Sequence, residues 1–323
     1  MSKRLLIREL LKSARFVSRE TPKKTGKSSL FHFFDFLVSY LKYGCSENHY
    51  LNEDFYKLRS FDRKNTVTKG RKNKICGIFN DAKFAKYFSD KVLFNRTFGE
   101  YVKRDWVYAR EATDDEIFSF VSIHKKVIVK PINLNKGRGI YLLDKDKLSE
   151  ESLHQLRNDN CLLEEYIDQH PAMQWGSQSV NSIRVITVLD GNGKVHVLKA
   201  GMRCGVGNSI VDNFSAGGGF YPLNLNGGFV EGYGEFGCEM NYSGIHPGTD
   251  NVIIGFQIPH WNKLIDMIKK AALIIPQVRY VGWDVAILPE GVELIEGNNG
   301  PGCTLLECVG EKRGFYKEIM SYR

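Results

Sequence analysis

Three oxygen-bearing side chains near the carboxyl end of the chain have the types and the spacing of a metal site. Residues 280–302 read as two short apolar strands joined by a turn at residues 289–291. Asp284 lies on the first strand, whereas Glu296 and Asn298 lie two residues apart at the end of the second and therefore point to the same face. Hard cations such as Mg²⁺ prefer oxygen ligands of this kind, completed by substrate phosphates. A solvated hairpin is less favoured because unpaired carboxylates are costly to bury, so the sequence predicts a Mg²⁺ site that handles a nucleoside triphosphate.

A lysine and a glycine-rich loop could contact the phosphates of this nucleotide. Lys130 lies in an apolar strand at residues 127–131, and a loop that contains Lys136, Gly137 and Gly139 follows it. A lysine at a strand end can bind a phosphate oxygen, and the backbone N–H groups of such a loop can wrap phosphates. A plain hairpin loop explains the pattern about as well.

Two other stretches could complete a nucleotide site. The strand at residues 161–167 could place backbone groups and an apolar side chain against an adenine, with a carboxylate near the ribose, although alone it is only a strand. Arg203 follows a hairpin at residues 181–200 and could supply a cation, and residues 217–219 could form a tight loop.

These residues need a scaffold, and the hydrophobic periodicity predicts an α+β fold. The expected helices cover residues 3–19, 30–58, 82–88, 91–98 and 261–275. The expected strands cover residues 75–79, 127–131, 161–167, 181–189, 195–200 and both arms of the hairpin at residues 280–302. Residues 59–74 are expected to form a polar basic linker, and residues 204–250, which are rich in glycine, are expected to be mostly loop.

Size and composition are those of a globular protein. The chain has 323 residues, of which 42% are apolar and 25% charged, and it can hold two or three subdomains. It has no run of 18 apolar residues, so we expect no transmembrane helix, and its amino terminus lacks the features of a secretory signal. Seven scattered cysteines without a Cys-x-x-Cys pair favour reduced thiols in a cytoplasm over a disulfide scaffold or structural zinc.

The net charge of +8 is concentrated in the amino-terminal quarter. Residues 1–27 contain nine Lys/Arg and two Glu, and residues 57–74 contain eight Lys/Arg and one Asp, so the rest of the chain is net acidic. The helix at residues 3–19 admits three interpretations: a solvated face that packs on the body, a peripheral contact with the inner face of an anionic membrane, or a site for an acidic glycan or nucleic acid. Nucleic acid is the least favoured partner because no recognised binding module accompanies the basic residues.

In their order along the chain, these pieces resemble the ATP-grasp superfamily, and within it the branch of sugar-transfer-associated ATP-grasp proteins. The resemblance covers about residues 85–310 and is carried by residues 89–91, 128–131, 136–139, 164–166, 179–184, 211–218, 255–259 and 280–302. Segments 211–218 and 280–302 are specific, whereas the lysines and the glycine loop are generic.

The resemblance implies the ATP-grasp fold, in which two α+β subdomains clasp ATP, here with a helical, basic amino-terminal region. We therefore divide the chain into the basic helical region (1–75), the first part of the ATP-grasp body (76–125), a flap subdomain (126–200) and a catalytic subdomain with the metal site (201–323).

The resemblance also implies a role for each matching residue. Nucleotide contacts are expected from Lys91 and Lys130 at the phosphates, from Lys136, Gly137 and Gly139 in a closing flap, from Glu164, Glu165, Tyr166 and Ile167 at the adenine, and from Asp168 as the acid nearest the ribose. Asp284, Glu296 and Asn298 are expected to bind Mg²⁺, with Glu296 bridging two ions, and Gly302 lies where related ligases place a loop near the acyl-transfer centre. Arg203 resembles the arginine over the transferred phosphate. Related D-alanine–D-alanine ligases carry an arginine two residues before the metal aspartate; this chain has Gly282 there, so that role must fall to Arg203 or Arg184.

The function implied by the resemblance is ATP- and Mg²⁺-dependent formation of a C–N bond between a carboxylate and an amine, through an acyl phosphate. The expected substrate is a sugar, an amino sugar or a cell-surface polysaccharide precursor, by analogy with the family. Two alternatives stay open: a phosphotransferase on the same fold, and a non-catalytic nucleotide-binding protein. The presence of Asp284, Glu296 and Asn298 weighs against the second alternative.

Overall fold

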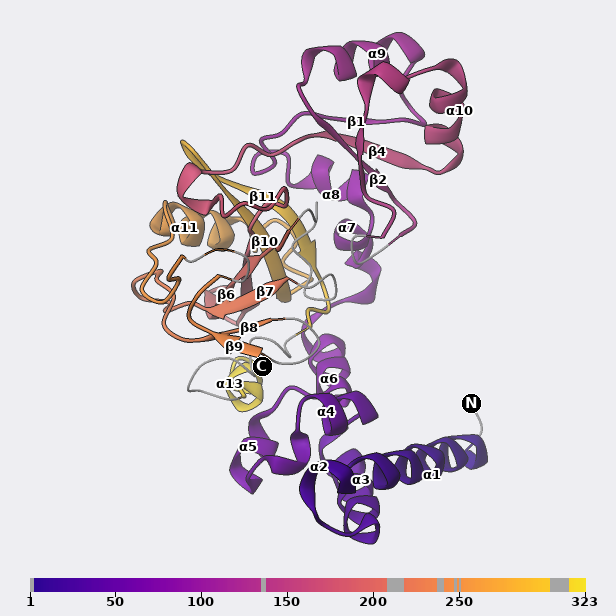
Figure 1. The fold of residues 1–323 in the computed structure, drawn as a ribbon, viewed down its shortest axis with the longest axis vertical. Helices are drawn as coiled ribbons and strands as arrows, with labels where there is room; N and C mark the ends of the chain where they lie inside the picture. Colours follow the sequence, from indigo (N-terminus) through magenta and orange to yellow (C-terminus); the bar gives the residue numbers. More distant parts are fainter. Residues whose placement is uncertain are drawn as a thin grey trace. The chain divides into compact units, whose positions relative to one another are not determined.

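Two structural units make up the chain. The structure, a computed structural model, describes residues 3–134, 138–207, 218–236, 241–246, 249, 251–302 and 314–323. Unit 1 consists of Met1–Phe79 with Gly302–Arg323, and unit 2 consists of Asn80–Pro301 (Figure 1).

All the secondary structure described in unit 1 is helical. Its helices are α1 (Lys3–Glu20), α2 (Pro22–Thr25), α3 (Ser29–Tyr43), α4 (Glu47–Asn52), the 3₁₀ turn η1 (Phe55–Lys57), α5 (Ser60–Asn65), α6 (Lys69–Phe79) and α13 (Tyr316–Ser321). The Ser28 hydroxyl caps the start of α3 by accepting a backbone N–H at 3.2 Å, and Gly44, with a φ of +66°, ends the helix. Ala14 and Val17 of α1 pack with Phe36 of α3 in the aromatic core of the unit.

The linker and the strand predicted between residues 59 and 79 are both wrong, because these residues form α5 and α6. Ile75 and Phe79 lie four residues apart and are both buried, so the apolar run is one face of a helix rather than a strand. Arg71 of α6 lies over two tyrosine rings of α3 and α13, with its guanidinium carbon 5.0 and 4.5 Å from the ring centroids. A basic residue of the supposed linker therefore packs helices together.

Unit 2 contains a four-stranded antiparallel sheet in the order β1-β4-β2-β3. Its strands are β1 (Trp106–Tyr108), β2 (Val127–Pro131), β3 (Tyr141–Leu143) and β4 (Cys161–Glu165), and α9 (Asp114–Ile123), η3 (Lys145–Lys147) and α10 (Glu150–Asn158) lie between them in the chain. Figure 1 shows α9 and α10 beside this sheet, and Ile117 and Leu153 of these helices pack on the buried side chains of β2 and β4. The strands predicted at residues 127–131 and 161–167 are confirmed, the second ending at Glu165.

A seven-stranded antiparallel sheet in the order β11-β10-β5-β6-β7-β8-β9 forms the other part of unit 2. Its strands are β5 (Ile183–Leu189), β6 (Val195–Cys204), β7 (Gly219–Pro222), β8 (Gly234–Phe236), β9 (Asn241–Ser243), β10 (Tyr280–Leu288) and β11 (Gly291–Asn298). The helices and 3₁₀ turns of this part are η2 (Ala82–Phe84), α7 (Lys86–Ser89), α8 (Lys91–Thr97), η4 (Pro171–Met173) and α11 (Trp261–Ala271). Trp261 and Leu264 of α11 share one apolar cluster with Trp283 of β10. Both predicted hairpins are confirmed, as is the helix that begins at Trp261.

The segment at residues 204–250, expected to be mostly loop, contains three short strands among its described residues. Glycines here and in β6 leave room for aromatic rings that pack directly on the backbone. A Cβ atom at Gly201 would lie 1.9 Å from the Phe220 ring, and one at Gly234 would lie 2.4 Å from the Tyr221 ring. The glycines therefore serve close packing within a sheet.

Two further properties bear on function. Within the described ranges, no helix is long and apolar enough to cross a lipid bilayer. Four cysteines fall in those ranges, Cys45, Cys76, Cys161 and Cys204, and the first three are free thiols. Burial raises the pKa of the Cys161 thiol to about 11, so this thiol is protonated and unreactive at neutral pH.

Replacing Gly201 with alanine is expected to destabilise the large sheet. The new methyl group would overlap the Phe220 ring, and overpacking of this kind costs about 1–3 kcal/mol. Urea unfolding measures the loss, with Gly191→Ala in the turn after β5 as the control, because a Cβ atom there meets nothing within 4 Å. The double variant Gly201→Ala/Phe220→Leu should regain part of the stability. An unchanged unfolding midpoint for Gly201→Ala alone would contradict this packing.

Candidate active site

Strand pairing brings the three predicted metal ligands together. Asp284 of β10 lies directly across from Glu296 of β11, and Asn298 lies across from Gly282. The neighbouring Trp283 points the other way, into the apolar core, so alternation along β10 turns Asp284 to the face that carries Glu296. The ladder shifts register immediately after this pair, an irregularity that is common beside active sites.

The Asp284 carboxylate is buried and paired with two arginines. Arg184, directly across on β5, donates from Nε to Oδ1 and from Nη2 to Oδ2, the second bond at 2.8 Å. Arg203 of β6 donates from Nη1 to Oδ2 at 3.0 Å. Burial by itself raises the pKa of Asp284, but the two guanidinium groups outweigh it and hold that pKa below its usual value. Asp284 is therefore anionic and keeps both arginines on one face of the sheet.

Glu296 is the solvent-accessible acid of the cluster. Asn298 Nδ2 donates to Glu296 Oε1 at 3.1 Å, which leaves the amide oxygen of Asn298 as an acceptor. The surrounding protein and then the negative charge of Asp284 raise the pKa of Glu296, although one side of the carboxylate faces solvent. A divalent cation would relieve the repulsion between the two acids, so the oxygens of Asp284, Glu296 and Asn298 suit Mg²⁺.

Gly282 makes room for the Arg184 guanidinium. A Cβ atom at position 282 would lie 3.2 Å from Arg184 Nη1 and 2.5 Å from the Cβ atom of Pro301. A larger side chain at position 282 does not fit this packing, and a guanidinium enters the space from β5 instead. The Arg184 guanidinium therefore lies directly beside position 282.

The two predicted phosphate-binding lysines lie near each other and near the acids. Lys130 forms an ion pair with the buried Glu164. Lys91 Nζ donates to two backbone oxygens of the loop after β2, at 2.9 and 3.3 Å. Burial lowers the pKa of Lys91, while the charge of Glu296 raises it and that of Lys130 lowers it. Lys91 is therefore within electrostatic reach of both Lys130 and Glu296.

A buried arginine without any sequence signal links the two sheets of unit 2. Arg104 Nη2 donates to Glu164 Oε1 at 3.0 Å, and its Nη1 donates to a backbone oxygen of β11 at 2.7 Å. Asn95 donates to the same Glu164 oxygen at 2.9 Å, and Glu293 of β11 pairs with Arg104 at 3.4 Å. Arg104 therefore connects β4 to β11, and through Glu164 it also fixes Lys130. A single arginine in a polar stretch looks like a solvated residue, so periodicity could not find it.

The expected adenine-binding segment, Glu164 to Ile167, covers the end of β4 and the two residues after it. The side chain of Glu164 is engaged by a lysine and an arginine, so any contact of this residue with a base would come from its backbone. The N–H groups of Glu165 and Tyr166 donate to backbone oxygens at 2.9 and 3.0 Å. Ile167 is buried and Asp168 is exposed. An apolar side chain followed by an exposed carboxylate is an order that suits an adenine and then a ribose.

His124 bridges two carboxylates beside this segment. Its Nε2 atom lies 3.4 Å from Asp105 Oδ2, and its Nδ1 atom lies 3.5 Å from Glu165 Oε1. The three side chains are close enough to hold a metal ion. The ring, however, directs its two nitrogens toward different acids, and one ion can bind only one of them. The geometry is explained without an ion, because His124 contacts both Asp105, the residue before β1, and Glu165 at the end of β4.

The remaining predicted residues belong to loops. Lys136 and Gly137 lie outside the described residues, as does most of the specific segment 211–218. Gly139 has a φ of +71°, a backbone conformation that favours glycine. Gly302 belongs to unit 1, whereas the other site residues that the structure describes belong to unit 2.

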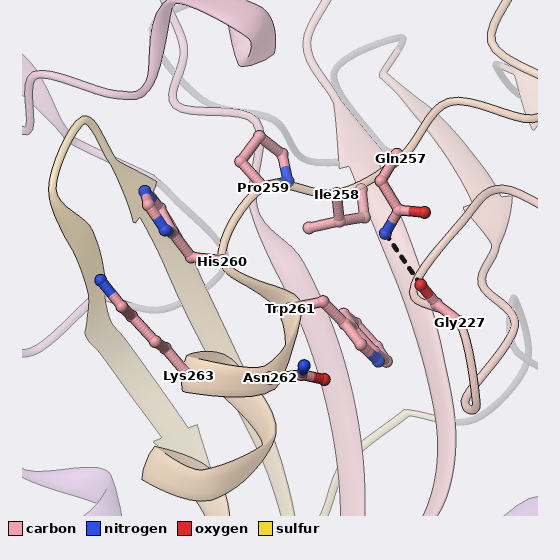
Figure 2. A pocket seen from close by; sticks show the side chains of 8 residues that line it. All are labelled: Gly227, Gln257, Ile258, Pro259, His260, Trp261, Asn262 and Lys263. Carbon is pink, nitrogen blue, oxygen red and sulfur yellow. Dashed lines mark hydrogen bonds between the residues drawn. The ribbon is translucent and has the colours of Figure 1, made fainter.

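A shallow pocket lies at the start of α11 (Figure 2). It has a volume of about 370 Å³ and is lined by Gly227 and residues 257–263. Gln257 Nε2 donates to the Gly227 backbone oxygen at 2.8 Å, and His260 and Lys263 point away from this bond. None of the predicted site residues that the structure describes lines the pocket.

Comparison with known families identifies the class of this protein. The sequence model of the sugar-transfer associated ATP-grasp family matches residues 71–319. The chain belongs to this family, and the predictions of an ATP-grasp fold and of this branch are confirmed. No curated protein matches the chain.

Solved ATP-grasp structures are similar to the chain at low sequence identity. The ATP-grasp ligase PsnB, complexed with a minimal precursor, Mg and ADP, matches with a TM-score of 0.47 and 12% identity over 76% of this chain and 60% of that chain. Biotin carboxylase from Campylobacter jejuni matches with a TM-score of 0.49 and 13% identity over 73% of this chain and 46% of that chain. An ADP complex of N5-carboxyaminoimidazole ribonucleotide synthetase matches with a TM-score of 0.46 and 10% identity over 73% of this chain and 52% of that chain. The chain thus spans about three fifths of the PsnB chain.

Removing Arg104 is expected to destabilise unit 2 strongly. Arg104→Met leaves Glu164 and Glu293 without their buried partner, and breaking such a pair costs about 3–5 kcal/mol. Urea unfolding at neutral pH measures the loss. The control is Arg96→Met, because Arg96 pairs with Glu111 at the exposed surface, where a pair contributes about 0–1 kcal/mol.

The loss of stability in Arg104→Met should also depend on pH. Burial alone would raise the pKa of Glu164, but Arg104 and Lys130 hold it well below its usual value. A glutamate whose pKa is lowered by folding stabilises the folded state at pH values above its unfolded-state pKa, which is about 4.3. This stabilisation is lost as the pH falls from that value toward the lower folded-state pKa. The difference in free energy of unfolding between the wild type and Arg104→Met should therefore become smaller at acidic pH. Equal stability of the two proteins at neutral pH would contradict the assignment.

Proposed function

We propose that this chain is an ATP- and Mg²⁺-dependent ligase that joins a carboxylate to an amine through an acyl phosphate. One observation carries the proposal: the buried Asp284 carboxylate, paired with two arginines, lies beside the accessible Glu296 and Asn298. This arrangement gathers ligands for cations and donors for anions at one place. Phosphoryl transfer depends mainly on such positioning and charge neutralisation.

In this proposal Asp284, Glu296 and Asn298 bind Mg²⁺, with Glu296 between two ions. The donor set fits the metal because Asp284 stays anionic and Glu296 has an open side. A carboxylate offers about four lone-pair sites, so the arginine donors do not use all the acceptor capacity of Asp284. When bound, the ions would neutralise the phosphate charge and stabilise the attacking and leaving oxygens.

The lysines bind the phosphates of ATP in this proposal. Glu164 holds Lys130 in place before the nucleotide arrives, and phosphate oxygens then compete with Glu164 for the ammonium group. Arg104 and Asn95 keep the Glu164 charge compensated during that exchange. The remaining assigned contacts are Lys91 at the phosphates, Lys136, Gly137 and Gly139 in the flap, Glu164, Glu165, Tyr166 and Ile167 at the adenine, and Asp168 at the ribose.

The two arginines take different roles in this proposal. The Arg203 side chain is 19% exposed and that of Arg184 is 8% exposed. Arg203 therefore contacts the transferred phosphate and the tetrahedral oxyanion, where one donor contributes about 3–4 kcal/mol. Arg184 fixes Asp284 from the next strand. The loop at Gly302 and the flap would keep water from the acyl phosphate.

We also propose that the acid or the amine belongs to a sugar, an amino sugar or a cell-surface polysaccharide precursor. The association of the family with sugar transfer supports this choice. The site of action would be the cytoplasm, at the inner face of the membrane. The exposed arginines of α1, within residues 3–19, support a peripheral contact there.

Product analysis tests the reaction. ATP turnover is screened against pairs of sugar acids, amino acids and amino sugars, and the products are identified by mass. A ligase releases ADP and phosphate in step with amide formation. Phosphate retained on the acceptor without an amide would show a phosphotransferase instead and would overturn the proposal.

Replacing Glu296 with glutamine is expected to abolish ATP turnover while the protein stays folded. The amide keeps the shape of the side chain but removes the negative charge that bridges the ions. The matched control is Glu290→Gln, because Glu290 is an exposed acid in the turn of the same hairpin. Steady-state release of ADP measures turnover, and circular dichroism checks the fold. Near-normal turnover in Glu296→Gln would refute the metal assignment.

A further inference from the structure

Helix α3 of unit 1 is apolar on its outward face as well as on its buried face. Its buried residues are His32, Phe36, Ser39 and Tyr43. On the other side, the four residues Leu30, Phe34, Val38 and Leu41 are exposed by 66%, 56%, 54% and 76%. Their spacing of four, four and three residues places them in one stripe along the helix. We call these four residues the outer stripe.

An exposed stripe of this kind indicates a binding surface. A helix that is apolar all round is normally buried, and contiguous exposed apolar surface marks contacts with other molecules. Phe31 extends the outer stripe by one further exposed ring. The described helices of unit 1 cover only the opposite face of α3.

The charges around the outer stripe are positive. Lys27 Nζ lies 4.5 Å from the centroid of the Phe31 ring at one end, and Lys42 follows Leu41 at the other end. Asp35 is the single acid in the sequence of α3, and it is turned inward, where Arg63 pairs with it at 2.7 Å and Tyr50 donates to it at 2.8 Å. No acidic side chain of α3 therefore faces outward.

Helix α1, which packs against α3, adds further positive charge. The exposed arginines of α1 are Arg4, Arg8, Arg15 and Arg19. Its two acids, Glu9 and Glu20, are paired with Lys12 and Lys23 within the same helical bundle. The surface of this part of unit 1 thus combines exposed apolar side chains with exposed arginines and lysines.

We propose that the outer stripe of α3, with Lys27 and Lys42 at its ends, docks on the anionic surface of a lipid bilayer. Apolar side chains on one helix face enter the boundary between headgroups and acyl chains, while lysines and arginines bind the anionic headgroups. A helix of 15 residues is too short to cross the bilayer and lies along it. The apolar part of the membrane contact is thereby placed on α3. The ligase assignment is not needed for it, because the residues proposed to contact the nucleotide that the structure describes lie in unit 2.

Vesicle binding of the full chain tests this surface. Sedimentation with vesicles of phosphatidylcholine and phosphatidylglycerol is compared with sedimentation with phosphatidylcholine alone. We expect binding to the anionic vesicles that weakens as salt is added, because the Debye length shrinks. Phe34→Glu/Leu41→Glu should lower the bound fraction at least about tenfold, since each charge must enter the apolar layer. Lys27→Glu/Lys42→Glu should lower binding to anionic vesicles specifically.

The matched control carries the same change on another exposed apolar residue. Ile123 at the end of α9 is 70% exposed, and Ile123→Glu should bind vesicles like the wild type. Circular dichroism and ATP turnover in solution, measured on every variant, separate loss of docking from loss of folding or of the unit 2 site. The milder variant Phe34→Ser keeps the test informative if a double variant misfolds.

Either of two results would overturn the proposal. The first is a Phe34→Glu/Leu41→Glu variant that binds anionic vesicles as well as the wild type does. The second is a wild-type chain that does not sediment with anionic vesicles, above all if the wild type is a dimer in sedimentation velocity and Phe34→Glu/Leu41→Glu is a monomer. That change from dimer to monomer would assign the outer stripe to a contact between protein chains.

Discussion

The candidate site depends on one buried carboxylate held between two guanidinium groups. Asp284 lies in the middle of β10, where an unpaired charge would be strongly unfavourable. Arg184 and Arg203 compensate it and are themselves fixed on neighbouring strands, at the place where anionic phosphates are expected. This arrangement requires β5, β6 and β10 to keep their register, since a slip of one residue would turn each of these side chains to the opposite face.

The four-stranded sheet also contains a buried acid that is paired with cations. Glu164 is a second buried carboxylate, and its cationic partners are Arg104 and Lys130. In each case a buried acid holds cations in place, which under the proposed function would reduce the ordering that nucleotide binding requires. Because Arg104 also binds β11, the geometry of Lys130 is coupled to the strand that carries Glu296.

The sequence predicted the parts of the site that leave a local pattern. Acids inside apolar strands marked Asp284 and Glu296 as a candidate site, and strand alternation predicted that they converge, as the pairing of β10 with β11 shows. Arg104 was missed because its partners lie about 60 and 190 residues away in the chain, and such contacts leave no local periodicity. Ile75 and Phe79 were assigned to a strand because the surrounding basic residues masked their helical spacing of four. The short strands beyond residue 204 were missed because glycine was read as a loop signal, although Gly201 and Gly234 serve close ring packing.

A crystal structure with ADP and Mn²⁺ in place of Mg²⁺ tests the central claim most directly, because Mn²⁺ can be located by its anomalous scattering. The account predicts an anomalous peak at ligand distance from oxygens of Asp284, Glu296 and Asn298. Asp284 should still be paired to Arg184, and the phosphates of ADP should reach the same ion. A nucleotide-bound crystal with no peak at these residues, or with the three side chains turned apart, would contradict it.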